Sequence, residues 1–173
     1  MDFFDVVNTR YSYRGAFNNK KLTQEEINKI LNSAIAAPIA MRVHSTSYIA
    51  ITDEKIIKDL GNIINTNGTK TAPFLLVLLT EDKTSNTRGM NFISENYAAA
   101  CENILLSVTA LGYATVWTDG FLRNKIANDK IREILNVPSS KTVRAVLAIG
   151  KPLNPEMPKE KVKIEELVVF NKF

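Results

Sequence analysis

A short stretch near the N-terminus, Arg10-Tyr11-Ser12-Tyr13-Arg14, carries the residues best suited to bind an anion. In an extended chain, successive side chains point to opposite faces, so Arg10, Ser12 and Arg14 would share one face and the tyrosines the other. Two guanidiniums that flank a hydroxyl form a compact receptor for phosphate, because arginine offers forked donors. The alternative is a surface strand with two solvated arginines and two half-buried tyrosines.

The composition is that of an ordinary globular domain, with 173 residues, 45% hydrophobic and 23% charged, and we predict one domain over residues 1–173. The net charge of +4 favours anionic ligands but is too scattered to predict nucleic-acid binding. No residue spacing is typical of a metal site. The longest apolar run, Phe74–Leu79, is far too short for a membrane span, and no signal peptide is evident, so we expect a cytoplasmic protein.

Hydrophobic periodicity predicts five helices that must position these residues. The first covers residues 2–9, and the second follows the capping box of Thr23 and Glu26 and ends at Pro38. The third begins after Asp53 and stops at the Asn65–Gly68 cluster. The longest helix runs from Met90 to Leu111, and the last one closes before Pro138. The longest helix contains Cys101, the single cysteine, in an apolar run that indicates a buried and inert thiol.

Four apolar segments predict strands, at residues 46–52, 74–79, 113–118 and 142–149. Residues 74–79 are apolar on both faces, which indicates a central strand covered on both sides. The tail from residue 151 is unusual, because three prolines at three-residue spacing precede a β-prone run, Leu167–Phe170. Such a run needs to be buried, so we expect it to pair with a sheet edge of its own chain or of a partner.

Four motifs in this order resemble the nitroreductase-like family of flavoproteins, over nearly the full length. Arg10–Arg14 resembles the family's Arg-x-Ser-x-Arg/Lys signature, and Ala36-Ala37-Pro38-Ile39-Ala40 is similar to its Ala-Ala-Pro-Ser-Ala turn. Thr118-Asp119-Gly120-Phe121 resembles the Glu-Gly-Phe or Gly-Gly-Phe turn beside the flavin ring. Ile149-Gly150-Lys151-Pro152 resembles the Ile-Gly-x-Pro exit of the last strand. No single motif is specific, whereas four at plausible separations are.

The resemblance implies an α+β fold, with a central, mostly antiparallel sheet flanked by helices. It also implies a homodimer in which the C-terminal arm, residues 151–173, is exchanged between the two chains. The cofactor would be FMN, in two sites at the dimer interface that are each built from both chains, and NAD(P)H would be the reductant.

The resemblance also assigns roles at the phosphate and ribityl end of FMN. Arg10 would meet the 5′-phosphate, and Lys161 from the C-terminal arm, with Lys163 as the alternative, would close over it. Ser12 would bind the ribityl chain or the phosphate. Arg14 would reach the N1/O2 edge of the ring, where negative charge grows on reduction, or else make a second phosphate contact.

Around the ring, the resemblance implies that the backbone N–H groups of Asp119 and Gly120 point at N5 and O4. Glycine permits that close approach, although the same residues also suit an ordinary turn. Asn65 is a candidate for the N3/O2 edge, with a plain helix-end asparagine as the alternative.

Pro38, Ile39 and Ala40 would line the flavin, mostly through backbone atoms. The chain departs from the family here, because Ile39 replaces serine, Arg42 replaces asparagine, and His44-Ser45-Thr46 replaces Gln-Pro-Trp. We interpret His44 as a substitute polar contact, and Arg42 as a candidate for binding the anionic end of a substrate or of NADPH.

No protein side chain is predicted to be catalytic, because the flavin carries the redox chemistry. The resulting hypothesis is an NAD(P)H-dependent flavin oxidoreductase that reduces nitroaromatics, quinones or similar electrophiles by a ping-pong mechanism at an open site. Alternatives are a specialised enzyme of the same fold such as a dehalogenase, a flavin storage or sensor protein without turnover, and a plain interaction module.

Overall fold

The computed structural model describes residues 1–172, and its centre is a four-stranded antiparallel sheet with the strand order β1-β2-β4-β3. The strands are β1 (Thr46–Ile51), β2 (Phe74–Glu81), β3 (Ala114–Thr118) and β4 (Lys141–Gly150). They confirm the four strands expected from the sequence. β2 and β4 are the inner strands, and β2 is buried along all but its last residue, as its apolar composition predicts.

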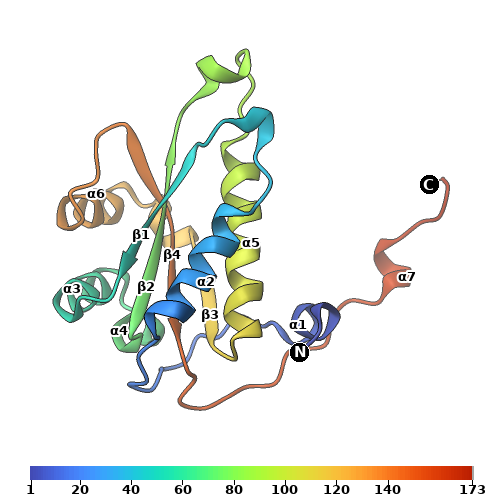
Figure 1. Cartoon of the computed structure of the whole chain (residues 1–173), viewed down its shortest axis with the longest axis horizontal. Helices are drawn as coiled ribbons and strands as arrows, with labels where there is room; N and C mark the ends of the chain where they lie inside the picture. Colours follow the sequence, from blue (N-terminus) through green and yellow to red (C-terminus); the bar gives the residue numbers. More distant parts are fainter. Residues whose placement is uncertain (173) are drawn as a thin grey trace.

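Helices cover both faces of this sheet, with α2 and α5 on one face and α3, α4 and α6 on the other (Figure 1). The bounds are α1 (Phe3–Thr9), α2 (Gln24–Ile35), α3 (Glu54–Ile64), α4 (Asn67–Thr71), α5 (Ile93–Ala110), α6 (Lys125–Ile134) and α7 (Ile164–Leu167), with short 3₁₀ turns η1 (Ala40–Arg42), η2 (Thr84–Thr87) and η3 (Gly120–Arg123). Within residues 1–172, no helix is long and apolar enough to cross a membrane.

Alternation along β2 divides the core into two clusters. Leu76 and Leu78 pack with α2 and α5, whereas Leu75 and Val77 pack with α3 and α6. Because both faces of the sheet are apolar and covered by helices, the sheet forms the buried centre that anchors the loops at its ends and edges. The predicted α+β fold, with helices that flank a mostly antiparallel sheet, is confirmed.

The chain's helix caps fix where α2 begins. The Thr23 hydroxyl accepts from the Glu26 N–H at 3.2 Å, and the Glu26 carboxylate accepts from the Thr23 N–H at 2.8 Å. This capping box is the one that the sequence predicts, and it satisfies two N–H groups that a helix start leaves without partners.

The structure adds to the sequence-based expectations in two places. The Asn65–Gly68 cluster does end α3, with Asn65 in the left-handed conformation (φ 57°), but Thr66 then caps the unexpected short helix α4. At the C-terminus, Leu167 belongs to α7, and Val168–Phe170 pair with no strand within residues 1–172. These side chains are exposed on an arm that leaves the body past α1 (Figure 1), so the exchange of the arm with a partner stays a prediction. The last residue of the arm, Phe173, lies outside the described residues.

Candidate functional site

The predicted anion-binding stretch lies along the outer edge of β3. Ser12 forms a parallel bridge with Thr115, and the Tyr13 N–H donates to the Thr115 carbonyl at 3.0 Å. The rings of Tyr11 and Tyr13 meet edge to face, 6.2 Å apart, and pack against the core on the α3/α6 side. The alternation therefore turns Arg10, Ser12 and Arg14 towards the other side of the edge, as the sequence predicts.

The two arginines differ in how strongly they are engaged. Arg10 is half-buried, with its Nε 3.9 Å from the Glu102 carboxylate on α5. Arg14 is exposed, and its Nη1 donates to the Ser12 carbonyl at 3.3 Å. A guanidinium has five N–H donors, so both side chains retain donors for an anion. The pairing with β3 is parallel at Ser12, and by Phe17 the chain has turned to pair with Pro152, just beyond the end of β4.

That turn begins at Asp119, which two side chains hold in place. The Asp119 carboxylate accepts from the Tyr97 hydroxyl on α5 at 2.9 Å and from Arg123 Nε at 3.2 Å. Burial raises the pKa of Tyr97, and the hydrogen bond to Asp119 raises it further, so this hydroxyl remains a protonated donor. The next residue, Gly120, is exposed, and a Cβ there would meet no heavy atom of the described residues within 4 Å. Its backbone is therefore open to close approach by a ligand.

The turn of Pro38, Ile39 and Ala40 is fixed by a buried amide on α5. Asn96 Oδ1 accepts from the Ala40 N–H at 2.8 Å, and Asn96 Nδ2 donates to Ser45 Oγ at 2.9 Å. After Ala40, both Met41 and Arg42 have left-handed backbone conformations, with φ of 54° and 57°. A strained turn of this kind persists because surrounding contacts hold it, and such turns concentrate at binding sites.

The remaining predicted residues fall on three different parts of the chain. Arg42 and His44 are exposed beside the Pro38–Ala40 turn, and Ile39 and His44 line a small cavity of about 130 Å³ that ends at β1. Asn65, also exposed, lies between α3 and α4, and α4 is tied to the N-terminal segment because the Phe17 N–H donates to Thr71 Oγ1 at 2.9 Å. Lys161 and Lys163 are exposed on the C-terminal arm.

Within one chain most of these residues form two separate groups, and Asn65, Lys161 and Lys163 lie outside both. The first, along β3, contains Arg10, Ser12, Arg14, Asp119 and Gly120, and the second is the turn tied to the start of β1. β1 and β3 are the outer strands, with β2 and β4 between them, so they lie roughly 14 Å apart at the usual strand spacing.

Helix α5 connects the two groups through side chains that the sequence reasoning missed. Asn96 holds the turn, Tyr97 holds Asp119, and Glu102 faces Arg10. The sequence offered little signal for them, because α5 also contains other polar residues, such as Glu95 and Asn103. Arg144 was also missed; it lies at an irregularity of the β2–β4 pairing, and its guanidinium is 5.0 Å from the centre of the Tyr97 ring.

The types of donor at this site indicate the charge of the ligand that it would bind. Among residues 1–172, no three His, Cys, Asp or Glu side chains gather in a way that could hold a metal ion. The donors at the β3 edge are cationic and backbone N–H groups, which suit an anionic ligand.

The α+β fold, the arginines at the β3 edge and the open glycine turn together define a class of protein. Comparison with known proteins identifies that class. The family model described as "Nitroreductase family" matches residues 7–69 and 64–151. The chain belongs to the nitroreductase family, which confirms the resemblance drawn from the four motifs.

Individual relatives agree with this assignment. An Archaeoglobus fulgidus protein, assigned by name as an NADH dehydrogenase/NAD(P)H nitroreductase, is 25% identical over 147 residues, which cover 85% of this chain and 83% of that protein. The crystal structure of a Clostridium acetobutylicum protein, assigned by name as an NADH oxidase, is similar at a TM-score of 0.83 with 28% identity, over 98% of this chain and 100% of that chain. An FMN-dependent nitroreductase from Clostridium difficile has the same fold, with a TM-score of 0.82 at 23% identity, over 98% and 99% of the two chains.

Proposed function

We propose that this chain is an FMN-dependent oxidoreductase that uses NAD(P)H to reduce small electrophilic acceptors such as nitroaromatics or quinones. Its family and the names of its relatives support the enzyme class, the FMN cofactor and the NAD(P)H reductant. The observation that carries the proposal is that the Arg10–Arg14 stretch pairs at Ser12 with β3, the strand that ends just before the open backbone of Gly120.

The residues on this edge fit the two ends of FMN. The phosphate end needs forked cationic donors and a hydroxyl, which Arg10 and Ser12 supply. At the ring end, the flavin must come close to backbone N–H groups without meeting a side chain, which the exposed Gly120 allows. Bound FMN would supply the redox chemistry by taking electrons from NAD(P)H and passing them to the acceptor after the oxidised nicotinamide has left, in a ping-pong cycle.

The protein's own contribution is to hold charge and geometry. Arg14 would present a fixed cation to the N1/O2 edge of the ring, where it stabilises the negative charge of the reduced state. Arg123 offsets the charge of the Asp119 carboxylate and the Tyr97 hydroxyl fixes its position, so the turn would hold the Gly120 N–H in place and limit the negative charge near the ring.

The Pro38–Ala40 turn would reach the flavin from a second copy of the chain. Its separation from Arg10–Arg14 within one chain supports a homodimer with shared sites. Large apolar side chains exposed on α1 and on the C-terminal arm supply surface that a second copy would bury, namely Phe3, Phe4, Leu167, Val169 and Phe170. In that dimer, Lys161 or Lys163 would close over the phosphate, and Arg42 and His44 would border the substrate side.

The visible spectrum before and after anaerobic addition of NADH or NADPH tests this function. The proposal predicts a yellow protein that is bleached by the reductant and recovers its colour with a nitroaromatic or a quinone. A yellow protein that neither reductant bleaches would instead be a storage or sensor protein. A colourless preparation that cannot be reconstituted with FMN would favour the plain interaction module.

A further inference from the structure

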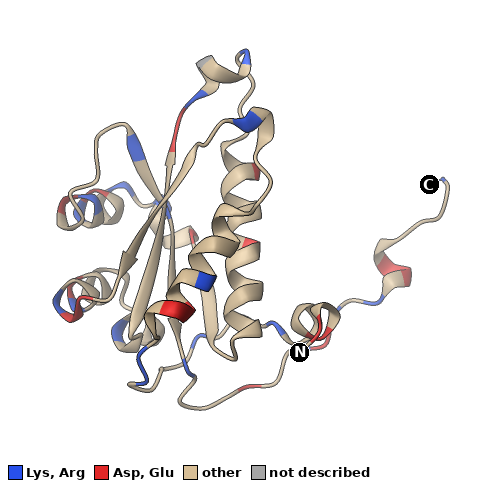
Figure 2. Ribbon diagram, in the orientation of Figure 1, with Lys and Arg blue, Asp and Glu red and all other residues tan. Residues whose placement is uncertain are grey.

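A second, larger cavity of about 410 Å³ lies beyond the end of β3, between η3, α6 and the start of β4. Its size is within the range of small-molecule sites. Lys and Arg positions recur on α6 and near the start of β4 (Figure 2). The charged residues that line the cavity are four cations and two carboxylates: Arg123, Lys125, Arg132, Arg144, Asp119 and Asp129.

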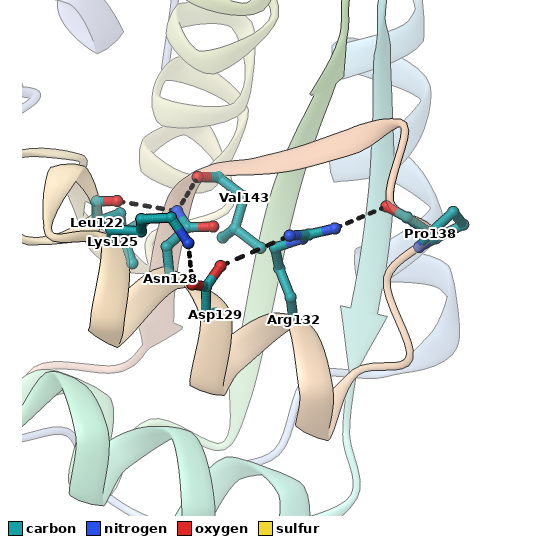
Figure 3. Close-up of polar contacts among 7 residues, drawn as sticks. All are labelled: Leu122, Lys125, Asn128, Asp129, Arg132, Pro138 and Val143. Atoms are coloured by element: carbon teal, nitrogen blue, oxygen red, sulfur yellow. Dashed lines mark hydrogen bonds and ion pairs between the residues drawn. The ribbon is translucent and has the colours of Figure 1, made fainter.

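The carboxylates of this cavity are already engaged. Asp129 Oδ2 lies 2.7 Å from Lys125 Nζ and its Oδ1 lies 3.6 Å from Arg132 Nη1, as Figure 3 shows. Asp119 pairs with Arg123 at 3.2 Å and also accepts from Tyr97. Four positive charges less two negative ones leave an excess of two, so the cavity attracts anions.

Two arginines of the lining keep a buried donor with no acceptor. Arg132 Nη2 donates to the Pro138 carbonyl at 3.2 Å (Figure 3), and the Arg144 guanidinium stacks over the Tyr97 ring. The Nε atoms of both arginines are nevertheless buried without a hydrogen-bond partner among the described residues. Because a buried Nε cannot itself reach a ligand, the donors that these two arginines offer to the cavity are their terminal Nη groups.

The backbone of β4 places Arg144 for this role. Leu78 pairs with Ala145 and Leu79 with Val143, which leaves Arg144 as the extra residue of a β-bulge. Bulges redirect side chains and are frequent beside functional sites. Asn128 fixes the neighbouring walls, because its Nδ2 donates to the carbonyls of Leu122 at 2.8 Å and Val143 at 2.7 Å (Figure 3).

We propose that this cavity binds a phosphate group of a small molecule, with Arg132 and Arg144 as its main contacts. Arginine matches phosphate oxygens in forked geometry, and Lys125 adds a point charge at the rim. Asp119 belongs both to the cavity wall and to the turn that precedes Gly120, so the bound molecule would extend towards the proposed flavin. The phosphate comes either from the pyrophosphate of the nicotinamide dinucleotide or from a separate phosphorylated compound. Only the first source rests on the proposed function.

A titration of the FMN-loaded protein with pyrophosphate, followed by ¹H–¹⁵N NMR, tests the site itself. We expect shift changes centred on η3, α6 and the start of β4, and an apparent Kd at least about tenfold weaker in Arg144→Gln and Arg132→Gln, the loss expected of one charge-assisted hydrogen bond. Lys29→Gln, which removes an exposed cation on α2, serves as the charge-matched control and should leave the Kd unchanged. Absence of shift changes around the cavity, or equal Kd values in the variants and the control, would overturn the proposal.

The half-buried arginines also pack, so a gentler variant is needed. Lys125 has a side chain that is 88% exposed, and Lys125→Gln should fold normally while weakening pyrophosphate binding roughly twofold to threefold, as expected for a solvated charge. If Arg144→Gln and Arg132→Gln fail to fold, an unchanged Kd in Lys125→Gln overturns the proposal.

Competition identifies the source of the phosphate. Displacement of pyrophosphate by ADP-ribose, together with a raised KM for NAD(P)H in Arg144→Gln, assigns the cavity to the reductant. Pyrophosphate binding that ADP-ribose does not displace assigns it to a separate phosphorylated compound. The same titration with flavin-free protein shows whether the cavity binds phosphate even if the proposed redox function fails.

Discussion

The guanidiniums of Arg10 and Arg14 make few contacts with the rest of the chain, which leaves them available to a ligand. The contact of Arg10 with Glu102 is long and partly solvated, so it competes weakly with a phosphate. The single hydrogen bond of Arg14 to the Ser12 carbonyl orients the guanidinium without neutralising it. Both cations can therefore act on a ligand at the β3 edge.

Replacing both arginines should remove most of the bound FMN. In Arg10→Ala/Arg14→Ala we expect the Kd for FMN to rise at least about a hundredfold, since each charged contact is worth about 1.5–3 kcal/mol. The dimer should remain, because neither residue belongs to its apolar surface. Fluorescence quenching of FMN on binding measures the affinity. Lys29→Ala/Lys58→Ala, which removes two exposed charges elsewhere, is the control, and an unaltered affinity in the arginine variant would refute the site assignment.

Cys101 should be chemically silent in the native protein. It is fully buried, and burial raises the pKa of its thiol to about 12, so the reactive thiolate is scarce at neutral pH. Iodoacetamide at pH 8 should label it only after unfolding in guanidinium, as mass spectrometry would report. Rapid labelling of the folded protein would show that α5 does not pack as described.

At the scale of single residues, the sequence pattern predicted those features that depend only on neighbouring residues. The alternation of Arg10, Ser12 and Arg14 with two tyrosines is a property of five consecutive residues, and the structure keeps it. Asn96, Tyr97 and Arg144 act across 22 to 56 residues of sequence or through a bulge, and one-dimensional periodicity carries no information about such partners.

Helix α2 depends on a carboxylate whose protonation is linked to folding. The pKa of Glu26 is lowered mainly because the Thr23 backbone N–H donates to it; the Tyr113 hydroxyl also donates to it, at 3.0 Å, while burial opposes the change. A group with a lower pKa in the folded state contributes stability at pH values above its unfolded pKa. That contribution is lost as the pH falls through the folded pKa.

Glu26→Gln should therefore flatten the acid limb of the stability profile. The wild type is expected to lose stability relative to the variant as the pH falls below the ordinary value of 4.5 for this group, and to exceed it near pH 7. Urea unfolding of both proteins from pH 7 to pH 3 measures the difference. A difference that stays constant with pH would contradict the role of this carboxylate.

At the scale of elements, the sequence predicted the long helices and the strands, and failed where a short element depends on its neighbours. The five residues of α4 are too few to show periodicity, and the helix is held by its Thr66 cap and by the contact between Thr71 and Phe17. In the β-prone run at the C-terminus, propensity indicates a strand, but a strand also requires an edge to pair with.

At the scale of the whole molecule, the sheet edges and the arm favour association of two copies. The arm exposes Leu167, Val168, Val169 and Phe170, each worth about 1.5–3 kcal/mol if fully buried. The fold class could be predicted because the apolar pattern of one chain determines it. The surface that the arm contacts could not be predicted, because the sequence does not say whether it belongs to the same chain or to a second copy.

Deleting residues 164–173 should weaken the proposed dimer. We expect the dimer dissociation constant to rise at least tenfold through loss of the apolar contacts of the arm, with the fold of the body preserved. Sedimentation velocity over a range of concentrations gives the constant, and Lys172→Ala is a control that leaves the apolar run intact. An equally tight dimer after the deletion would contradict the exchange of the arm.

The central claim, an FMN site completed by two chains, is tested most directly by complementation. Arg10→Ala/Arg14→Ala damages the β3 edge, and Ala40→Trp places a bulky side chain in the turn held by Asn96. Each variant alone should bind almost no FMN. A heterodimer of the two, isolated with a different tag on each chain, contains one site in which both halves are intact, so we predict that it recovers about half of the FMN of the wild-type dimer. A heterodimer that binds no more FMN than either variant alone would contradict a site shared between two chains.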